Sequence, residues 1–219
     1  TSPFDFGYVW ITPRGKLEYE RANKEQERSS ADMTTTIHQP ITPVGSPYGF
    51  RDEDWEIVAE KKSLGNMLLV VFGYPFKSKF YDTTKLKGNL EKSFKLSVDK
   101  YNSLPNAIPV TLDFRPLAAG YGEHLFNEIC RDIISADIAV FETSDMNPNV
   151  MLEMGVALTY GIRVLPIKMK DRPKPPSDIS GQTWADYENS AETFVDPDHS
   201  KKILRMVERS ARKKGKSRR

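Results

Sequence analysis

The sequence lacks the features of secreted and membrane-spanning proteins. Its 219 residues include one cysteine, Cys130, so a disulfide within the chain is excluded, which favours a reducing compartment. No stretch approaches the roughly 18 uninterrupted apolar residues of a membrane-spanning helix. No short apolar segment follows a basic one at the start, as in a secretory signal. We therefore expect a cytoplasmic protein that has no membrane among its partners.

Histidine is too sparse to suggest a metal centre. His38, His124 and His199 are scattered, and none has a cysteine or histidine neighbour at the spacing of zinc ligands. Cys130 falls in a stretch with the pattern of an amphipathic helix, which favours a buried thiol over a nucleophile. We expect no structural metal and no cofactor.

Positive charge is concentrated at one end of the chain. The net charge is +2, but residues 209–219 hold seven Lys or Arg and no acid, which leaves 2 − 7 = −5 for the remainder. Such a run is usually a solvated end, so we expect a disordered basic tail at 209–219. Contact with nucleic acid through this tail is the alternative.

Residues 1–65 are predicted to be an extension rather than part of the main domain. A strand-like run at 8–11, a Thr-Pro-Arg-Gly turn and a helix-favouring stretch resemble the wing and last helix of a winged-helix domain. Residues 1–28 are thus either a remnant of such a domain or a linker. Residues 29–65 are predicted to be a linker rich in Ser, Thr, Pro and Gly, followed by a short helix at 52–61.

Strand and helix patterns alternate from residue 66 to residue 208, and this range is predicted to be one domain. Alternation of this kind indicates an α/β fold with a doubly wound, mostly parallel sheet of five strands, and we expect the flavodoxin-like order. Pro166 places the fourth strand near an edge, because proline cannot donate to a ladder. Strands are predicted at 67–72, 108–112, 138–141, 164–167 and 182–187, and helices at 84–102, 123–135, 148–160 and 201–209.

Ligands of open α/β sheets bind beyond the carboxyl ends of the strands, so the turns at those ends are the candidate site. The three predicted turns are Gly73-Tyr74-Pro75-Phe76, Asp113-Phe114-Arg115, and the segment from Glu142 to Asn149.

The helix predicted after the third turn carries a single charge, Glu153, among apolar residues. Asn147 is a good N-cap and Pro148 suits the first helical position, so the helix start is well defined. Asn149 lies one turn before Glu153 and is placed to orient it. Burying an unpaired carboxylate costs several kcal/mol, which favours a functional role for Glu153. The alternative is a hydrogen bond from Glu153 to a neighbouring loop. Gly155 inside the helix suggests that sheet or ligand comes close.

These residues resemble the nucleoside 2-deoxyribosyltransferase-like family, which is related in fold to TIR-like domains. The resemblance covers about 130 residues and rests on an Ala-Asp-hydrophobic strand at 136–141, the Asn-Pro-Asn-Val turn at 147–150 and the Glu-x-Gly-x-Ala helix at 153–157. A strand that ends in Pro-Phe, matched by Pro75-Phe76, precedes them in the family.

The resemblance implies an N-glycosidic bond as the target, with Glu153 as the nucleophile. Asn149, with Asp113 or Glu142, is expected to assist. The family commonly has Asp where this chain has Glu142, which leaves the role of Glu142 open. The expected substrate-binding residues are Gly73, Tyr74, Pro75, Phe76, Arg115 and Asn147, with the Tyr74 ring stacking on a base and Arg115 meeting a phosphate, or else both packing as ordinary loop residues.

Two functions follow from this resemblance. The first is an enzyme that cleaves or transfers the N-glycosidic bond of a nucleoside, a nucleotide or NAD, with NAD as a substrate rather than a cofactor. The second is a non-catalytic nucleotide-sensing or effector module coupled to another domain. Sites of the family often borrow residues from a neighbouring subunit, so a homo-oligomer is a further expectation.

Overall fold

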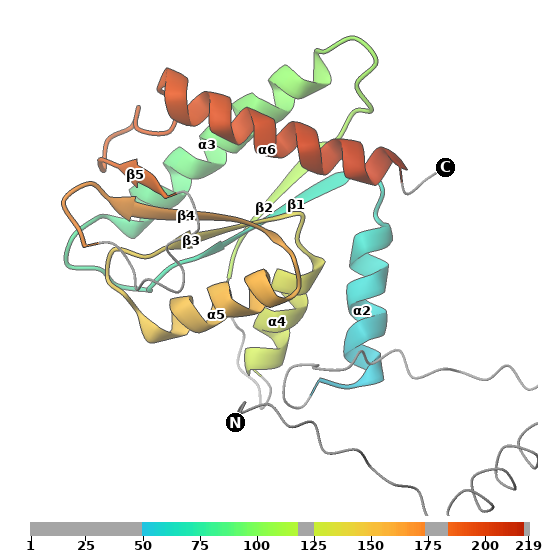
Figure 1. Cartoon of the computed structure of the whole chain (residues 1–219), viewed down its shortest axis with the longest axis horizontal. Coiled ribbons are helices and arrows are strands. Elements are labelled where there is room, and N and C mark those ends of the chain that lie inside the picture. Colours follow the sequence, from blue (N-terminus) through green and yellow to red (C-terminus); the bar gives the residue numbers. More distant parts are fainter. Residues whose placement is uncertain (1–49, 118–124, 174–183, 217–219) are drawn as a thin grey trace, which may run out of the picture. The chain divides into compact units, whose positions relative to one another are not determined.

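The structure, a computed structural model, describes residues 50–117, 125–173 and 184–216. They form a five-stranded sheet in the order β2-β1-β3-β4-β5, with every neighbouring pair parallel (Figure 1). This confirms the predicted doubly wound, flavodoxin-like α/β fold. The strands are β1 (Met67–Gly73), β2 (Thr111–Pro116), β3 (Ile138–Glu142), β4 (Arg163–Met169) and β5 (Ala185–Tyr187).

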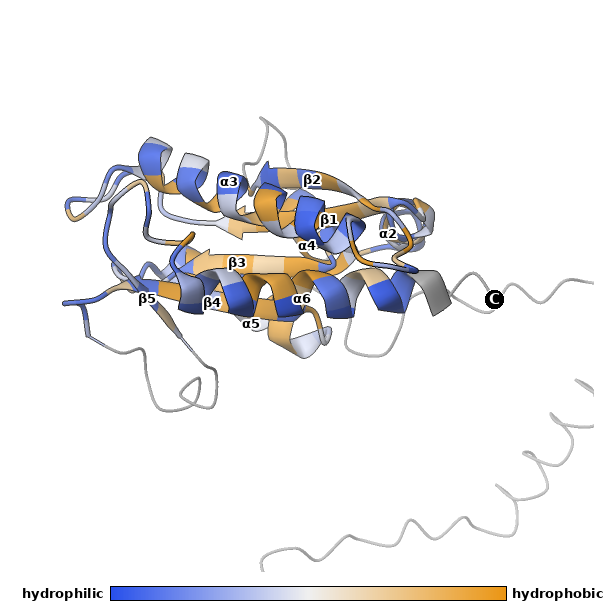
Figure 2. Ribbon diagram, turned by 90° about the horizontal axis from the view of Figure 1, so that it is seen from above, coloured by the Kyte–Doolittle hydropathy of each residue, from blue (hydrophilic) through white to orange (hydrophobic). Residues whose placement is uncertain are grey.

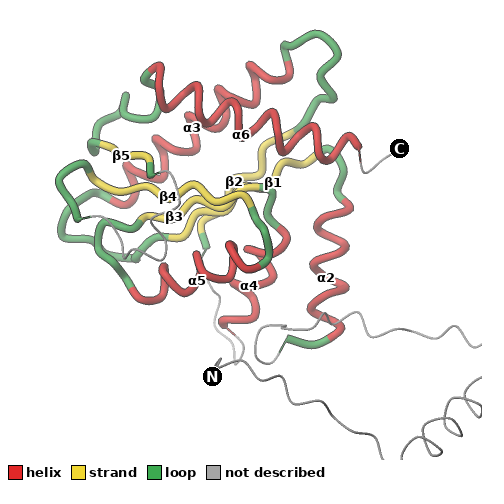
Figure 3. Tube along the Cα trace, in the orientation of Figure 1, coloured by secondary structure: helices red, strands yellow, loops and turns green. Residues whose placement is uncertain are grey.

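Helices cover both faces of the sheet (Figure 3). The helices α3 and α6 lie on one face, and α4 and α5 lie on the other; α2 packs against α4. Their bounds are α2 (Asp52–Ser63), α3 (Thr83–Asn102), α4 (Leu125–Ser135), α5 (Pro148–Thr159) and α6 (Pro197–Lys216). The connection from β1 to β2 runs through α3 on one face of the sheet, and the connection from β3 to β4 runs through α5 on the other face. The winding direction therefore changes between β1 and β3.

The central strands are buried on both sides, which explains their nearly unbroken apolar sequences. Along β1, Leu68 and Val70 point into the core under α3 and α6, whereas Leu69 and Val71 point into the core under α4 and α5. In Figure 2, β3 has the colour of hydrophobic residues along most of its length, and α6 is banded with hydrophobic and hydrophilic residues. The sheet is therefore held by two cores.

Two predicted elements, β2 and α6, have the wrong boundaries at both ends, and α6 begins at Pro197 rather than 201. β2 begins at Thr111 rather than 108 and extends through Pro116, so Asp113 and Arg115 lie inside the strand and not in the turn after it. α6 extends to Lys216, so residues 209–216 are helical rather than a disordered tail. The reason is a buried stripe formed by Ile203, Val207 and Ala211, which repeats every four residues beneath the basic surface.

Other predictions fall where expected or outside the described residues. Pro166 precedes the part of β4 that pairs with β5, since that pairing starts at Ile167. The helix predicted at 52–61 is α2. The predictions for 1–28 and for the linker up to residue 49 lie outside the described residues. No described helix has both the length and the hydropathy that a lipid bilayer requires.

The end of α6 is fixed by an ion pair, and this gives the first prediction. The Lys214 ammonium lies 2.9 Å from the Asp137 carboxylate and also donates to the Met67 carbonyl, and both charged side chains are largely buried. Replacing Lys214 with Met leaves the Asp137 charge without its cation, so we expect the free energy of unfolding to fall by about 3 kcal/mol. Chemical denaturation at pH 7 measures this.

Lys202→Met on the exposed side of α6 is the matched control, with an expected change within about 0.5 kcal/mol. Equal effects of the two substitutions would contradict the structural role of the Lys214 ion pair.

Candidate functional site

A cavity of about 540 Å³ opens at the carboxyl ends of β1 and β3, between the two strands where the winding direction changes. Its size falls within the roughly 300–1,000 Å³ of small-molecule sites. Parallel open sheets place their ligands at this kind of position. The described residues that line it are Tyr74, Pro75, Phe76, Leu117, Leu125, Phe126, Ile129, Asn147, Asn149, Val150, Leu152 and Glu153.

Glu153 reaches the end of β1 from α5. A Cβ atom at Gly73 would lie 2.8 Å from Oε2 of Glu153 and 2.6 Å from Cδ1 of Phe141, both too close for a real contact. The carboxyl group therefore occupies space that only a glycine at the end of β1 leaves free. Gly73 thereby makes room for the predicted nucleophile, and its predicted contact with substrate stays a prediction.

The Glu153 carboxyl has no hydrogen bond or ion pair with any described residue. Burial alone raises its pKa, to about 7. A carboxylic acid in such surroundings is protonated and ionised in comparable amounts at neutral pH. The sequence alternative, in which Glu153 bonds a neighbouring loop, has no support among the described residues.

The start of α5 follows the sequence prediction. The Asn147 side chain caps the helix by accepting from the backbone N–H groups of Asn149 and Val150, and Pro148 occupies the first turn. Asn149 and Glu153 line the same cavity. A Cβ atom at Gly155 would have no neighbour within 4 Å, so the sheet does not approach this glycine, and the approach of a ligand stays a prediction.

The turn after β1 forms one wall of the cavity. Tyr74, Pro75 and Phe76 all line it. The Tyr74 ring already stacks on Phe72, with 4.7 Å between the ring centroids, so one of its faces is occupied. Phe76 is 76% exposed and lies at the mouth, where its ring is free to contact a ligand.

Glu142 does not join Glu153. Side chains alternate along β3, so Phe141 faces the core under α4 and α5 while Glu142 faces the opposite side. There Glu142 is fully buried and accepts from Tyr81 Oη at 2.6 Å, from Tyr187 Oη at 3.2 Å and from the Ser144 amide and hydroxyl. Burial raises the pKa of Glu142 against these hydrogen bonds. The satisfied contacts fit a structural role.

Asp113 and Arg115 also lie apart from the cavity. Their side chains pair with each other along β2, with 2.6 Å between Nη2 and Oδ2. Asp113 lies opposite Leu69 and Arg115 opposite Val71, four and two residues before the end of β1, and neither charged side chain lines the cavity. The structure therefore does not place them with Glu153.

The apolar wall opposite Glu153 was missed from the sequence. Leu125, Phe126 and Ile129 fall in the helix predicted at 123–135, for which no site role is expected, yet all three line the cavity and Leu125 is 45% exposed. The adjacent pair Leu125-Phe126 was the available signal, because neighbours on a helix point about 100° apart. Leu117, just after β2, completes this wall.

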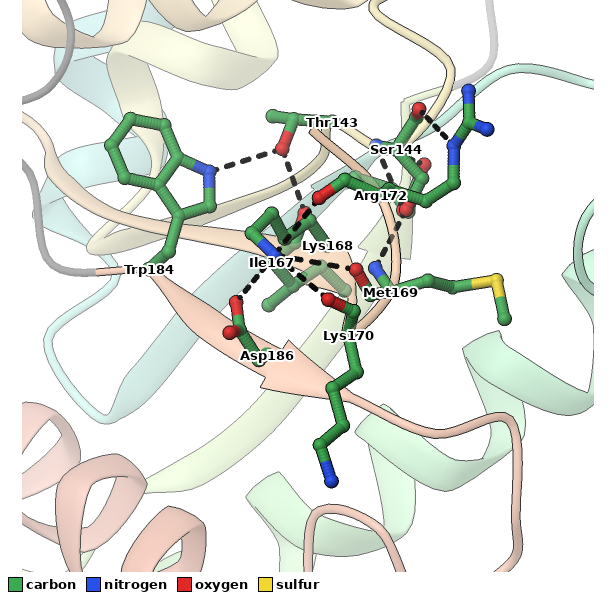
Figure 4. A network of polar contacts seen from close by, with 10 residues as sticks. Thr143, Ser144, Ile167, Lys168, Met169, Lys170, Arg172, Trp184 and Asp186 are labelled. Carbon is green, nitrogen blue, oxygen red and sulfur yellow. Dashed lines mark hydrogen bonds and ion pairs between the residues drawn. The ribbon is translucent and has the colours of Figure 1, made fainter. Parts of the chain in front are cut away.

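A polar network fixes the loop that leads from β3 to α5 (Figure 4). The buried Lys168 ammonium donates to the Arg172 carbonyl at 3.2 Å and pairs with Asp186 at 3.0 Å. The Arg172 guanidinium in turn donates to the Ser144 carbonyl, and the Ser144 hydroxyl accepts from the Met169 amide. These contacts hold the start of the loop whose far end presents Asn147.

Neither a thiol nor a metal centre adds to the site among the described residues. Cys130 is buried, which confirms the expected buried thiol. Burial is the main reason why the pKa of its thiol is raised to about 12. Within residues 50–117, 125–173 and 184–216, no three or more His, Cys, Asp or Glu side chains are grouped to hold a metal ion.

No protein-family model matches this chain, and no curated protein matches it. The functional argument therefore depends on the geometry of the cavity and on the motif residues in its walls.

The desolvated carboxyl of Glu153, which has no partner in the described part of the chain, makes stability depend on pH. Between the unfolded value of 4.5 and the folded value of about 7, the unfolded state releases its proton first, so stability falls as the pH rises. Glu153→Gln removes this penalty. We expect the variant to exceed the unsubstituted protein by about 3 kcal/mol in unfolding free energy at pH 8 and to equal it near pH 4. Urea denaturation at both pH values measures the difference.

Glu56→Gln, on the exposed side of α2, is the matched control and is expected to show no such pH-dependent gain. The same stability difference at pH 4 and pH 8 for Glu153→Gln would show that its carboxyl is not desolvated.

Gly73 supplies a second test of the packing at the site. Gly73→Ala forces the Phe141 ring or the Glu153 carboxyl to move, so we expect a loss of about 1–3 kcal/mol in unfolding free energy. Gly155→Ala meets open space in the same region, and we expect it to gain up to about 1 kcal/mol from helix propensity. Thermal and urea unfolding of the two variants compare them directly; a neutral Gly73→Ala would contradict the close approach.

Proposed function

We propose that this chain binds a nucleoside at the Glu153 cavity and cleaves or transfers its N-glycosidic bond, with Glu153 as the nucleophile. The observation that carries the proposal is a desolvated carboxyl that has no partner among the described residues and lies in an apolar cavity at the carboxyl ends of the strands. A group held in this state is costly to the fold and suited to chemistry near neutral pH.

The motif residues support the same reaction. The Asn147-Pro148-Asn149-Val150 turn starts α5, and the helix carries Glu153 to the turn that contains Pro75 and Phe76. These are the segments on which the resemblance to the nucleoside 2-deoxyribosyltransferase-like family rests. Six of the ten residues expected in the site line one cavity, and Gly73 adjoins it.

The proposed reaction has two steps. An ionised oxygen of Glu153 attacks C1′ of the sugar, the C1′–N bond breaks with its electron pair, and the base leaves after taking a proton from water. The product is a glycosyl ester of Glu153. Water then attacks C1′, loses a proton and releases the sugar and the carboxylate; attack by the nitrogen of a second base transfers the sugar instead.

The described walls favour an uncharged nucleoside over a nucleotide or NAD. The described residues that line the cavity include no Lys, Arg or His, and Arg115 pairs with Asp113 in β2. Phe126, Ile129 and Leu125 offer an apolar surface for a base, and Asn149 offers an amide to a sugar hydroxyl. The Glu153 carboxyl itself disfavours a phosphate beside it.

One observation favours the second candidate, a module that binds nucleosides without turnover. Glu142 and Asp113, the acids expected to assist, lie away from Glu153. Among the described residues the cavity thus lacks a second acid to protonate a departing base. Binding without product release is the outcome that selects this candidate.

The test is release of free base from a panel of nucleosides, followed by chromatography, with nucleotides and NAD as further arms. We expect release from nucleosides and at least about a thousandfold loss in Glu153→Gln, whereas Glu56→Gln stays active. Because the nucleophile must be ionised, the rate should rise with pH and level off above pH 7. No release from any substrate, even at high protein concentration, would overturn the enzymatic proposal.

Calorimetry with the same nucleosides separates the two candidates. Binding without release, weakened when Leu125 or Ile129 is replaced with Asp in the cavity wall, supports the sensing module. If the protein neither binds nucleosides nor releases a base from them, nucleosides are excluded as ligands of this cavity.

A further inference from the structure

A second cavity lies at the opposite edge of the sheet, where β3 and β4 begin. Its volume is about 230 Å³. It is formed where the ends of α2, α4, α5 and α6 meet, and the proposed catalytic cavity lies beyond the carboxyl ends of the strands. Four cationic side chains and one acid line it: Lys62, Arg163, Lys213, Lys214 and Asp137.

Two of these charges cancel each other. Lys214 pairs with Asp137 at 2.9 Å and also donates to the Met67 carbonyl. The Asp137 carboxylate additionally accepts from the Leu69 amide at 2.8 Å. This pair is part of the framework of the fold, and it leaves Lys62, Arg163 and Lys213 facing the cavity.

The remaining three cations have no acidic partner among the described residues. Arg163 Nε donates to the Ser210 hydroxyl at 3.2 Å, a neutral group. Lys62 and Lys213 have neither an ion pair nor a hydrogen bond with any described residue. Burial, followed by repulsion from Lys213, lowers the pKa of Lys62 even though Asp137 acts in the opposite direction. The cavity thus holds about three uncompensated positive charges.

The ends of helices give another explanation for lysines in this region. Cations near a helix C-terminus are stabilised by the helix dipole, typically by about 0.3–1 kcal/mol each. Lys62 lies in the last turn of α2, and Lys213 lies in the last turn of α6. The dipole therefore explains one cation at each helix end, but it does not explain why Arg163, at the start of β4, joins them around one cavity.

We propose that this cavity binds the phosphoryl group of a small phosphorylated ligand through Lys62, Lys213 and Arg163. A phosphate monoester carries nearly two negative charges and several acceptor oxygens, which match the ammonium and guanidinium donors. The volume fits a phosphoryl group with a small attached moiety. It is too small for a duplex, and a nucleic-acid backbone would need an extended basic surface.

This site is independent of the proposed function. It shares no lining residue with the Glu153 cavity, and it lies at the amino ends of the strands. A ligand held here would contact α2 and α6 together, which are far apart in sequence and meet at this edge of the sheet (Figure 1).

The experiment is a titration of the full chain with inorganic phosphate, followed by thermal unfolding, with sodium chloride at matched ionic strength as reference. We expect phosphate to raise the melting temperature in a saturable way that chloride does not reproduce. In Lys62→Gln/Lys213→Gln the apparent affinity should fall at least tenfold. In Lys201→Gln/Lys202→Gln, on the exposed start of α6, it should be unchanged.

A second readout separates ligand binding from a structural role. Without phosphate, Lys62→Gln/Lys213→Gln should melt at the same temperature as the unsubstituted protein or higher, because two repelling charges are removed. A lower melting temperature would mean that the two lysines stabilise helix ends, and would overturn the proposal.

Three other outcomes also decide the matter. A phosphate effect retained in Lys62→Gln/Lys213→Gln, or equalled by chloride, would contradict binding in this cavity. Tighter binding of short duplex DNA than of phosphate through the same two lysines would also contradict the proposal, because the partner would then be a nucleic acid. Glu153→Gln should leave the phosphate effect unchanged, which keeps this test separate from that of the proposed function.

Discussion

The site depends on an acid that packs against a bare strand end. Gly73 leaves the end of β1 without a side chain, and the Glu153 carboxyl fills part of that space without a described partner. Desolvation of a carboxylate disfavours the charged form, so the native fold carries the cost of its ionisation. The two cores, the capped start of α5 and the network around Lys168 together hold this arrangement in place.

Glu142, which is fully buried, and Glu153, which is half-buried, show how the same type of side chain takes two roles at the carboxyl ends of the strands. Glu142 ends β3 and faces Tyr81, Tyr187 and Ser144, which donate to it. Glu153 faces the other side of the sheet and receives no such donors from the described residues. Stable networks satisfy their buried acids, whereas reactive sites leave an acid available to a ligand. This contrast, more than the motif, separates the structural from the proposed functional residue.

Local signals explain what was predictable from the sequence. The unbroken apolar run at 67–72 predicted the buried parallel strand β1. The Asn147-Pro148 pair predicted the start of α5. Both signals lie in residues that are adjacent in the sequence. The order of the sheet followed from the alternation of elements. Glu153, Asn149 and the turn after β1 lie on these well-defined elements and line one cavity, and their functional roles stay predictions.

The failures have physical causes that no local pattern reveals. β2 is an edge strand whose Asp113 and Arg115 neutralise each other, so its polar half resembled a turn. Because side chains alternate along β3, Glu142 faces the side of the sheet opposite Phe141. Whether Glu142 belongs to the strand or to the turn depended on placing the end of β3 to within one residue. The stripe of Ile203, Val207 and Ala211 was hidden among lysines and arginines, and the ion pair of Lys214 with Asp137 joins residues far apart in the chain.

The central claim is that the Glu153 carboxyl is desolvated and has no partner among the residues that the structure describes. Its own titration tests this claim most directly. Carbon-13 NMR of the side-chain carboxyl groups, with Glu153 assigned by comparison with Glu153→Gln, follows ionisation in the folded protein. The account predicts a midpoint near pH 7. A midpoint near the ordinary glutamate value of about 4.3 would contradict it, because the carboxyl would then be solvated or paired.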